Sequence, residues 1–143
     1  MHTYKLYLPI QYKILIFGVL FILTLVGLGL LAANIHFGPK IQTLPVPFIL
    51  IFFLVIGWNW HVVLTIPYEI RMDETSRIEF VSLARHIVVM SSAVQSIKPA
   101  GGNSLYVLKH DQGKIRLFIQ FTGFYEFLTM LKTVNPAVEI IGI

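Results

Sequence analysis

The chain contains no cysteine, which excludes disulfides, thiolate catalysis and cysteine-ligated metal sites. Charge is also scarce: 13% of the 143 residues are charged, whereas a soluble domain usually has about a quarter. No Asp, Glu, Lys or Arg occurs in residues 14–39 or in residues 41–68. All seven acidic residues follow residue 66, together with eight of the eleven basic ones. The second part is therefore nearly neutral, and the high pI does not indicate a nucleic-acid binder.

Two uncharged stretches are long enough to cross a membrane. Residues 14–33, ILIFGVLFILTLVGLGLLAA, would reach about 30 Å as a helix, the thickness of a bilayer core. A cleaved signal peptide is the alternative, but signal apolar regions span only about 7–15 residues. The second stretch, 46–66, has Pro45 and Pro47 at its start and is followed by Pro67. We therefore predict transmembrane helices at about 14–36 and 46–66, joined by a short linker into an antiparallel hairpin.

The distribution of lysine and arginine predicts the orientation of this hairpin. Lys5 and Lys13 precede the first span, Lys40 alone lies in the linker, and Arg71 and Arg77 follow the second span. The bias favours an integral protein of the bacterial inner (cytoplasmic) membrane with both termini in the cytoplasm. The segment 1–66 would form the anchor, and 67–143 would form a cytoplasmic domain.

The segment GWNWHVV, residues 57–63, lies near the end of the second span. Aromatic rings with a polar tip gather at membrane interfaces, so we interpret the residues of this type as an interfacial belt. The belt comprises Tyr7, Tyr12, Trp58 and Trp60. Residues 58–61 point in four directions on a helix, which argues against one converging site. His61 as an axial ligand to a pigment or metal, and polar contact with a neighbouring helix, remain alternatives.

Small residues near the end of the first span suggest a helix contact. Gly29 and Ala33 are four positions apart, the spacing that allows close approach of two membrane helices.

From Tyr68 the hydrophobic periodicity becomes that of short strands. The predicted strands are 68–74, 77–83, 86–90, 94–99, 104–110 and 114–120, with turns at 73–76 and 111–113. Residues 122–134 then show helical spacing, with Thr122 as a suitable N-cap. The apolar stripe of this helix comprises Phe124, Phe127, Leu128 and Leu131. We predict a small, mainly-β domain in which a bent antiparallel sheet is closed by a C-terminal helix.

This pattern resembles the bacterial pleckstrin-homology-like (PH-like) domains. The similar segments are IPYEIRMDETSRIEF, VQSIKP before a glycine break, LYVLKHDQGKIRLF, and the closing GFYEFLTMLKTVNP. The resemblance implies a non-enzymatic scaffold that binds proteins, peptides or lipid head groups. Some membrane-anchored members accompany the assembly of large membrane complexes, photosynthetic ones included. The phosphoinositide pocket of many eukaryotic members needs basic residues around the first hairpin turn, where this chain has DETS, so that activity is not expected.

The sequence shows no catalytic constellation. It has no nucleophile–base pattern, phosphate-binding loop or metal-ligand spacing, and its five histidines are scattered. We expect no enzymatic activity, no cofactor, no metal, no nucleic acid and no small-molecule substrate. Lys114 and Arg116 share one face of a strand, and Lys109 lies on the opposing strand. These three form either a solvated face or a basic strip for anionic head groups or an acidic partner.

The segment AVEIIGI, residues 137–143, is unusually apolar for a domain end. We expect Val138, Ile140 and Ile141 to be covered, either by pairing within their own sheet or by adding a strand to a partner. The partner is the favoured alternative, because the domain is small and its helix already covers one opening.

These observations support three hypotheses. The first is an accessory or assembly subunit of a larger membrane protein complex. The second is a module that binds anionic membrane lipids, and the third is a pigment- or metal-binding subunit that uses His61.

Overall fold

The computed structural model describes residues 4–37, 45–101 and 104–142. The chain divides into two compact units. One unit is the helical segment Gln11–Val63, and the other is formed by the residues on both sides of that segment. The sheet-containing unit is therefore discontinuous in sequence, and the helices are an insertion in it.

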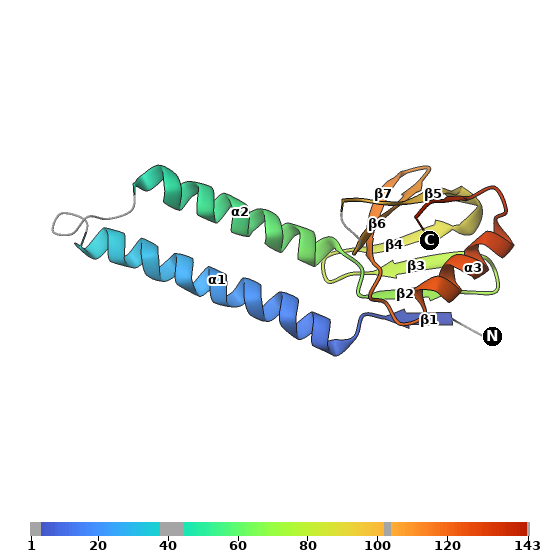
Figure 1. Ribbon diagram of the computed structural model, residues 1–143, viewed down its shortest axis with the longest axis horizontal. Coiled ribbons are helices and arrows are strands. Elements are labelled where there is room, and N and C mark those ends of the chain that lie inside the picture. The colour runs from blue at the N-terminus through green and yellow to red at the C-terminus, as the bar shows by residue number, and fades with distance from the viewer. Residues whose placement is uncertain (1–3, 38–44, 102–103, 143) are drawn as a thin grey trace. The chain divides into compact units, whose positions relative to one another are not determined.

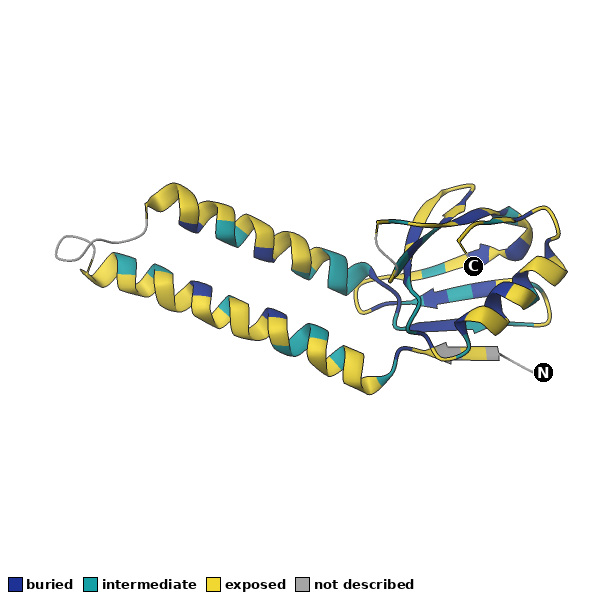
Figure 2. Ribbon diagram, in the orientation of Figure 1, coloured by how far each residue is buried: buried dark blue, intermediate teal, exposed yellow. Residues whose placement is uncertain are grey.

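Two helices are long and apolar enough to cross a membrane. Helix α1 (Ile10–Phe37) has 28 residues and α2 (Val46–Thr65) has 20, with mean hydropathies of 2.9 and 2.0 in their most apolar windows. Only 11% of each window is buried, so most of the apolar surface needs cover from outside the chain. Figure 2 shows this exposure along both helices. The two expected spans are thus present as helices, and α1 starts at Ile10, directly after Pro9.

The remaining elements form two open four-stranded sheets and a third helix (Figure 1). Sheet A has the order β1 (Tyr4–Tyr7), β2 (Glu69–Met72), β3 (Arg77–Val81) and β4 (His86–Met90), all antiparallel. A short 3-10 turn, η1 (Ser91–Ala93), leads to sheet B. Sheet B has the order β7 (Gly113–Phe118), β6 (Leu105–His110), β5 (Val94–Pro99) and β8 (Glu139–Ile140). The six strands expected after residue 67 are present, and neither sheet is closed in the described part of the chain.

Strand β1 was not among the predicted elements. It pairs with β2, so that Tyr7 lies opposite Glu69, and the Leu8 backbone N–H donates to the Tyr68 carbonyl oxygen at 3.0 Å. The expected division at 66/67 assigned this segment to the anchor, whereas the structure assigns it to the sheet unit. The two chain segments that lead to the hairpin therefore leave from neighbouring strands of one sheet.

Helix α3 (Phe124–Val134) packs its apolar stripe into the core shared by both sheets. Phe124, Phe127, Leu128 and Leu131 are all buried, as the helical spacing predicted. The expected N-cap at Thr122 is wrong: the cap is Gly123, in the left-handed conformation with φ of 78° and no side-chain bond. Thr122 instead donates its backbone N–H to the carbonyl oxygen of Tyr7, which ties the helix start to β1.

The apolar tail pairs within its own sheet, contrary to the favoured expectation of a partner. Strand β8 runs parallel to β5, and Val138, just before it, is completely buried in the core. Ile140 packs against the core and Ile141 is 43% exposed. The Tyr106 hydroxyl donates to the Gly142 carbonyl oxygen, and this bond holds Gly142 beside β6. The free edge of β5 is therefore covered internally because the chain reverses after α3 and returns alongside it.

Candidate functional site

A side-chain hydrogen bond joins the two apolar helices. The Trp60 Nε1–H donates to Thr24 Oγ1 at 2.9 Å, and the Thr24 hydroxyl donates to the Leu20 carbonyl oxygen at 2.7 Å. The Trp60 ring also lies 6.3 Å from the Phe17 ring. Trp60 thus contributes to the hairpin contact that the sequence left as an alternative. Trp58, by contrast, is 63% exposed.

The two helices approach each other closely at Gly27. A Cβ placed on this residue would lie 2.5 Å from Phe52 Cε1, so only glycine fits without a shift of that ring. The predicted packing residues Gly29 and Ala33 are exposed, and nothing lies within 4 Å of a Cβ placed on Gly29. Within the hairpin the close contact is therefore at Gly27, two positions before Gly29 and on a different face of α1. Gly29 and Ala33 remain candidates for packing against a helix outside the hairpin.

The polar groups around His61 do not converge. The Asn59 side chain donates to the Val55 carbonyl oxygen at 2.8 Å, within its own helix. His61 is exposed, with its ring 6.1 Å from that of Trp58. Among the described residues, no group of three His, Asp or Glu side chains is placed to hold a metal ion. The other two belt residues, Tyr7 in β1 and Tyr12 in the first turn of α1, are exposed.

Four basic residues of the sheet unit lie on the outer face of sheet B. Lys109 of β6 lies directly opposite Lys114 of β7, and Arg116 lies opposite Val107, two positions along each strand. Side chains two apart on a strand share a face, so the three predicted cations lie together. Lys98 of β5 lies opposite Val107 on its other side and joins the same face. We call the four residues Lys98, Lys109, Lys114 and Arg116 the basic face.

Stability of the fold does not explain this arrangement. Like charges directly opposite on neighbouring strands are destabilising, by a few tenths of a kcal/mol up to roughly 1 kcal/mol. In the described residues no acidic side chain forms an ion pair with Lys109, Lys114 or Arg116. All three are exposed, so the charges remain hydrated and accessible. An anionic partner would relieve the repulsion.

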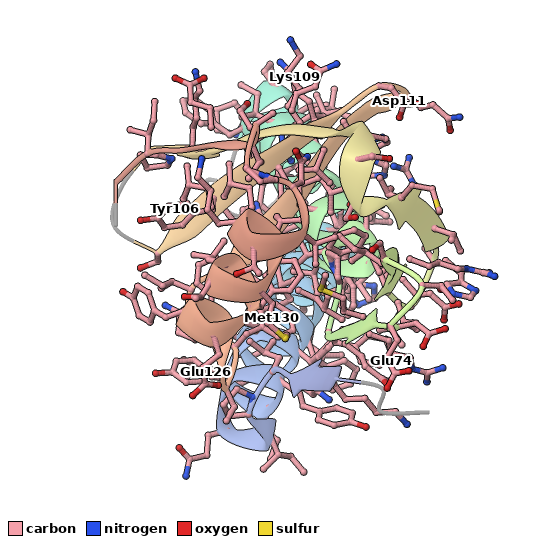
Figure 3. The ribbon with its side chains drawn as sticks, turned by 90° about the vertical axis from the view of Figure 1, so that its right-hand side faces the viewer. Glu74, Tyr106, Lys109, Asp111, Glu126 and Met130 are labelled. Atoms are coloured by element: carbon pink, nitrogen blue, oxygen red, sulfur yellow. The ribbon has the colours of Figure 1, made fainter. Side chains whose placement is uncertain are left out.

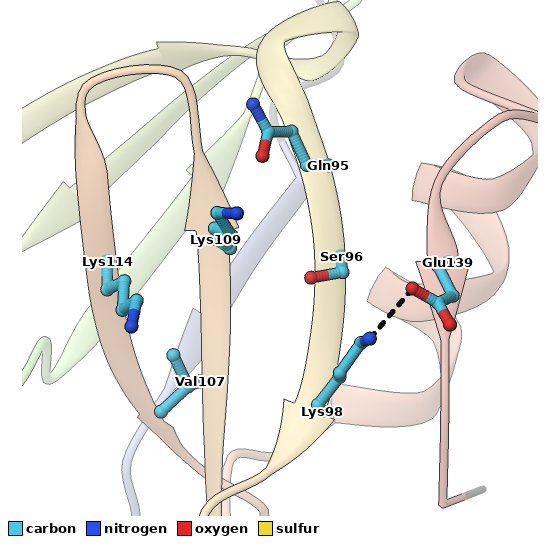
Figure 4. A pocket seen from close by; sticks show the side chains of 7 residues that line it. All are labelled: Gln95, Ser96, Lys98, Val107, Lys109, Lys114 and Glu139. Atoms are coloured by element: carbon cyan, nitrogen blue, oxygen red, sulfur yellow. Dashed lines mark ion pairs between the residues drawn. The ribbon is translucent and has the colours of Figure 1, made fainter.

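A shallow pocket of about 340 Å³ lies on the basic face (Figure 4). One side carries an ion pair, in which Lys98 Nζ lies 2.8 Å from Glu139 Oε2 of β8. The other side carries Lys109 and Lys114, and Val107 also lines the pocket. The remaining lining residues are Gln95 and Ser96. The pocket therefore offers three ammonium groups, the carboxylate of Glu139 and one apolar side chain.

Sheet A differs from sheet B in the balance of charge on its outer face. Arg71 Nε donates to Glu69 Oε1, and this hydrogen bond, followed by the charge of Glu69, raises the pKa of Arg71 above its ordinary value. Arg77 lies 3.3 Å from Glu79, and His86 lies 3.5 Å from the other oxygen of that carboxylate. Arg71, Arg77 and His86 thus have anionic neighbours, and Lys5 of β1 lies opposite Arg71, so the outer face of sheet A carries charges of both signs.

Asp111 lies close to the basic face, whereas Glu74 and Glu126 lie away from it (Figure 3). Figure 3 shows Lys109 and Asp111 near the β6–β7 turn, and Glu74 and Glu126 at the opposite side of the same view. His110, the neighbour of Lys109, is buried and its Nδ1 accepts a bond from the Gln112 backbone N–H at 3.3 Å. This histidine therefore serves the turn, and the positive charge of the face comes from lysine and arginine.

Comparison with protein-family models, with curated proteins and with solved structures gives no match.

One cation of the basic face, Lys98, was missed by the sequence analysis. The segment 94–99 was predicted as a strand, but its register against 105–110 was not, and the register contains a bulge between Val94 and Ser96. The glycine break that follows Lys98 indicates a hairpin, and this signal could have placed the lysine beside β6. The parallel strand that supplies Glu139 gave no comparable signal.

Proposed function

We propose that this protein is a non-enzymatic, membrane-anchored interaction module and an accessory subunit of a larger membrane protein complex. Its basic face binds an acidic segment of a partner subunit. The observation that carries this proposal is the unneutralised cross-strand pair Lys109–Lys114, with Arg116 beside it. Cations that cost stability by their proximity and form no ion pair among the described residues are best explained by a partner that brings the anion.

Three further observations support the anchor and the scaffold. Both helices expose apolar surface along their length, which suits lipid or other membrane helices. The antiparallel strands β2–β7 followed by α3 support a PH-like domain, to which β1 and β8 are additions. The lysine and arginine bias supports a bacterial inner-membrane location with the sheet unit in the cytoplasm.

An anionic lipid surface is the second candidate for the basic face. The observation that favours it is the shortness of the connections: two residues separate β1 from α1, and three separate α2 from β2. Such links reach about 7–11 Å at most, so head groups are within range of the tethered domain. Each basic residue near an anionic membrane adds roughly 1 kcal/mol of attraction.

Charge reversal separates the two candidates. The full-length tagged chain is purified from native membranes in mild detergent, either unchanged or with Lys109→Glu and Arg116→Glu together. The matched control reverses two cations of sheet A, Arg71→Glu and Arg77→Glu. Loss of one stoichiometric protein from the basic-face variant alone supports the subunit proposal. If only bound phosphatidylglycerol or cardiolipin is lost, the lipid candidate replaces it, and unchanged protein and lipid content contradicts both.

A further inference from the structure

The turn between β3 and β4 is held at the end of the second apolar helix. The backbone N–H of Ala84 in this turn donates to the carbonyl oxygen of Leu64 at 2.9 Å. Leu64 is the penultimate residue of α2, and it belongs to the same compact unit as the two sheets. Carbonyl groups in the last turn of a helix lack partners within the helix, and this bond satisfies one of them.

The position of Leu64 along α2 places the turn at head-group depth. Leu64 lies one turn after Trp60, which corresponds to about 6 Å along the helix. Tryptophan in a spanning helix concentrates at the interface, and each interfacial layer is roughly 5–8 Å thick. If α2 spans the membrane with its tryptophans at that level, Leu64 and the bonded turn lie in the same layer.

The turn carries the side chains that such a layer accepts. Leu83 is 59% exposed, and the following basic residue, Arg85, is exposed as well. Ser82 fixes the turn, because its hydroxyl donates to the Arg85 carbonyl oxygen at 2.8 Å and accepts the Arg85 backbone N–H at 3.0 Å. No acidic residue occurs between Glu79 and Asp111 in the sequence. An exposed apolar tip with a cation beside it matches the boundary between acyl chains and phosphates.

We propose that the β3–β4 turn docks on the bilayer in which α1 and α2 are embedded. Leu83 inserts at the boundary of the acyl chains, and Arg85 binds lipid phosphate. This contact is a second attachment of the sheet unit to the membrane, and it limits how far the unit can tilt about its two short links. The proposal rests on the membrane anchorage proposed above and is independent of the basic face.

Because the chain has no cysteine, a spin label can be placed at one introduced cysteine at a time. The test position is Leu83→Cys. The aqueous control is Thr75→Cys, an exposed residue in the turn at the other end of β3, and the hydrocarbon control is Leu25→Cys, an exposed position within α1. Each full-length variant is reconstituted into vesicles of phosphatidylcholine and phosphatidylglycerol. The rate at which the label collides with oxygen, which partitions into the membrane, is then compared with its collision rate with a water-soluble nickel chelate.

We expect the ratio of the oxygen collision rate to the nickel-chelate collision rate at position 83 to lie between the ratios at positions 25 and 75. Adding Arg85→Gln should shift the ratio at 83 toward that of the aqueous control. A ratio at 83 equal to that at 75, with position 25 in hydrocarbon, overturns the docking proposal and leaves the anchor intact. Aqueous values at all three positions contradict both the docking and the membrane anchorage, so the two failures are distinguishable.

Discussion

Tyr7 lies directly opposite Glu69 in the pairing of β1 and β2, although the whole helical hairpin separates them in sequence. The chain therefore enters and leaves the hairpin from adjacent positions of one sheet. The hydrogen bond from the Leu8 backbone N–H to the Tyr68 carbonyl oxygen joins the two segments just before and after the helices. Strand pairing requires both flanking segments to be on one side of any membrane that the hairpin crosses. This geometry makes the hairpin an insertion with two attachments, and it differs from an anchor that precedes an independent domain.

The pairing of β1 with β2 predicts a specific cross-link. Tyr7→Cys combined with Glu69→Cys should form a disulfide on mild oxidation, because directly opposite residues bring their Cβ atoms within about 5.5 Å. The full-length variant is analysed by mass spectrometry of the non-reduced protein. Tyr7→Cys with Thr75→Cys is the control and should remain reduced. Equal cross-linking of both pairs would contradict the assigned register.

The hydrogen bond between Trp60 and Thr24 predicts unequal roles for the two tryptophans. Trp60→Phe removes the donor while keeping an aromatic ring, and it should destabilise the hairpin by roughly 0.6–2 kcal/mol. Trp58→Phe should have a smaller effect, because that side chain is mostly exposed. The measurement is unfolding in mixed micelles with increasing dodecyl sulfate, followed by far-ultraviolet circular dichroism. A larger loss of hairpin stability for Trp58→Phe would show that the belt residue contributes more to stability than the Trp60–Thr24 hydrogen bond.

Local patterns in the sequence predicted the local elements. The two apolar runs, the strands between 68 and 120 and the stripe of α3 all follow from periodicity within a few residues. What could not be predicted depends on distant pairing. Strand β1 has four residues, and its partner lies beyond the entire hairpin, so no local signal connects them.

The tail and the basic face show the same limit. The apolar pattern of residues 138–141 indicated a covered segment, which is right for Val138 and Ile140 but wrong for Ile141. Whether its own sheet or a partner covers the segment depends on how the chain returns after α3. Lys109, Lys114 and Arg116 were grouped correctly because a hairpin register is short-range. Lys98 was missed although β5 and β6 form a hairpin, whereas Glu139 joins the face only through β8, whose position depends on the tertiary fold.

The buried stripe of α3 predicts a strong difference between two neighbouring substitutions. Leu128→Asp buries a charge among apolar side chains and should prevent stable folding of the sheet unit. Tyr125→Asp, at an exposed position of the same helix, should leave the unit folded. Hydrogen exchange of the full-length chain, followed by mass spectrometry of peptides from β6 and β7, reports the difference. Protection retained in Leu128→Asp would mean that α3 is not part of the core.

Asn135 predicts a further stability effect, because it links the end of α3 to the connection between the sheets. Its side-chain Nδ2 donates to the carbonyl oxygens of Ser91 and Val94 at 2.8 and 2.9 Å, and the residue is buried. Asn135→Ala removes both bonds where water has little access, which should lower the free energy of unfolding by about 1–3 kcal/mol. For a domain of this size the melting temperature should fall by about 4 °C or more.

Thr133→Ala is the matched control: it also removes a hydrogen bond to a carbonyl oxygen, that of Thr129, but at an exposed position, where water replaces it. Both variants are melted as the full-length chain in mild detergent, with the β-sheet signal followed by circular dichroism. Equal melting temperatures for the two variants would show that the link between α3 and η1 contributes little, and that the core alone positions the two sheets.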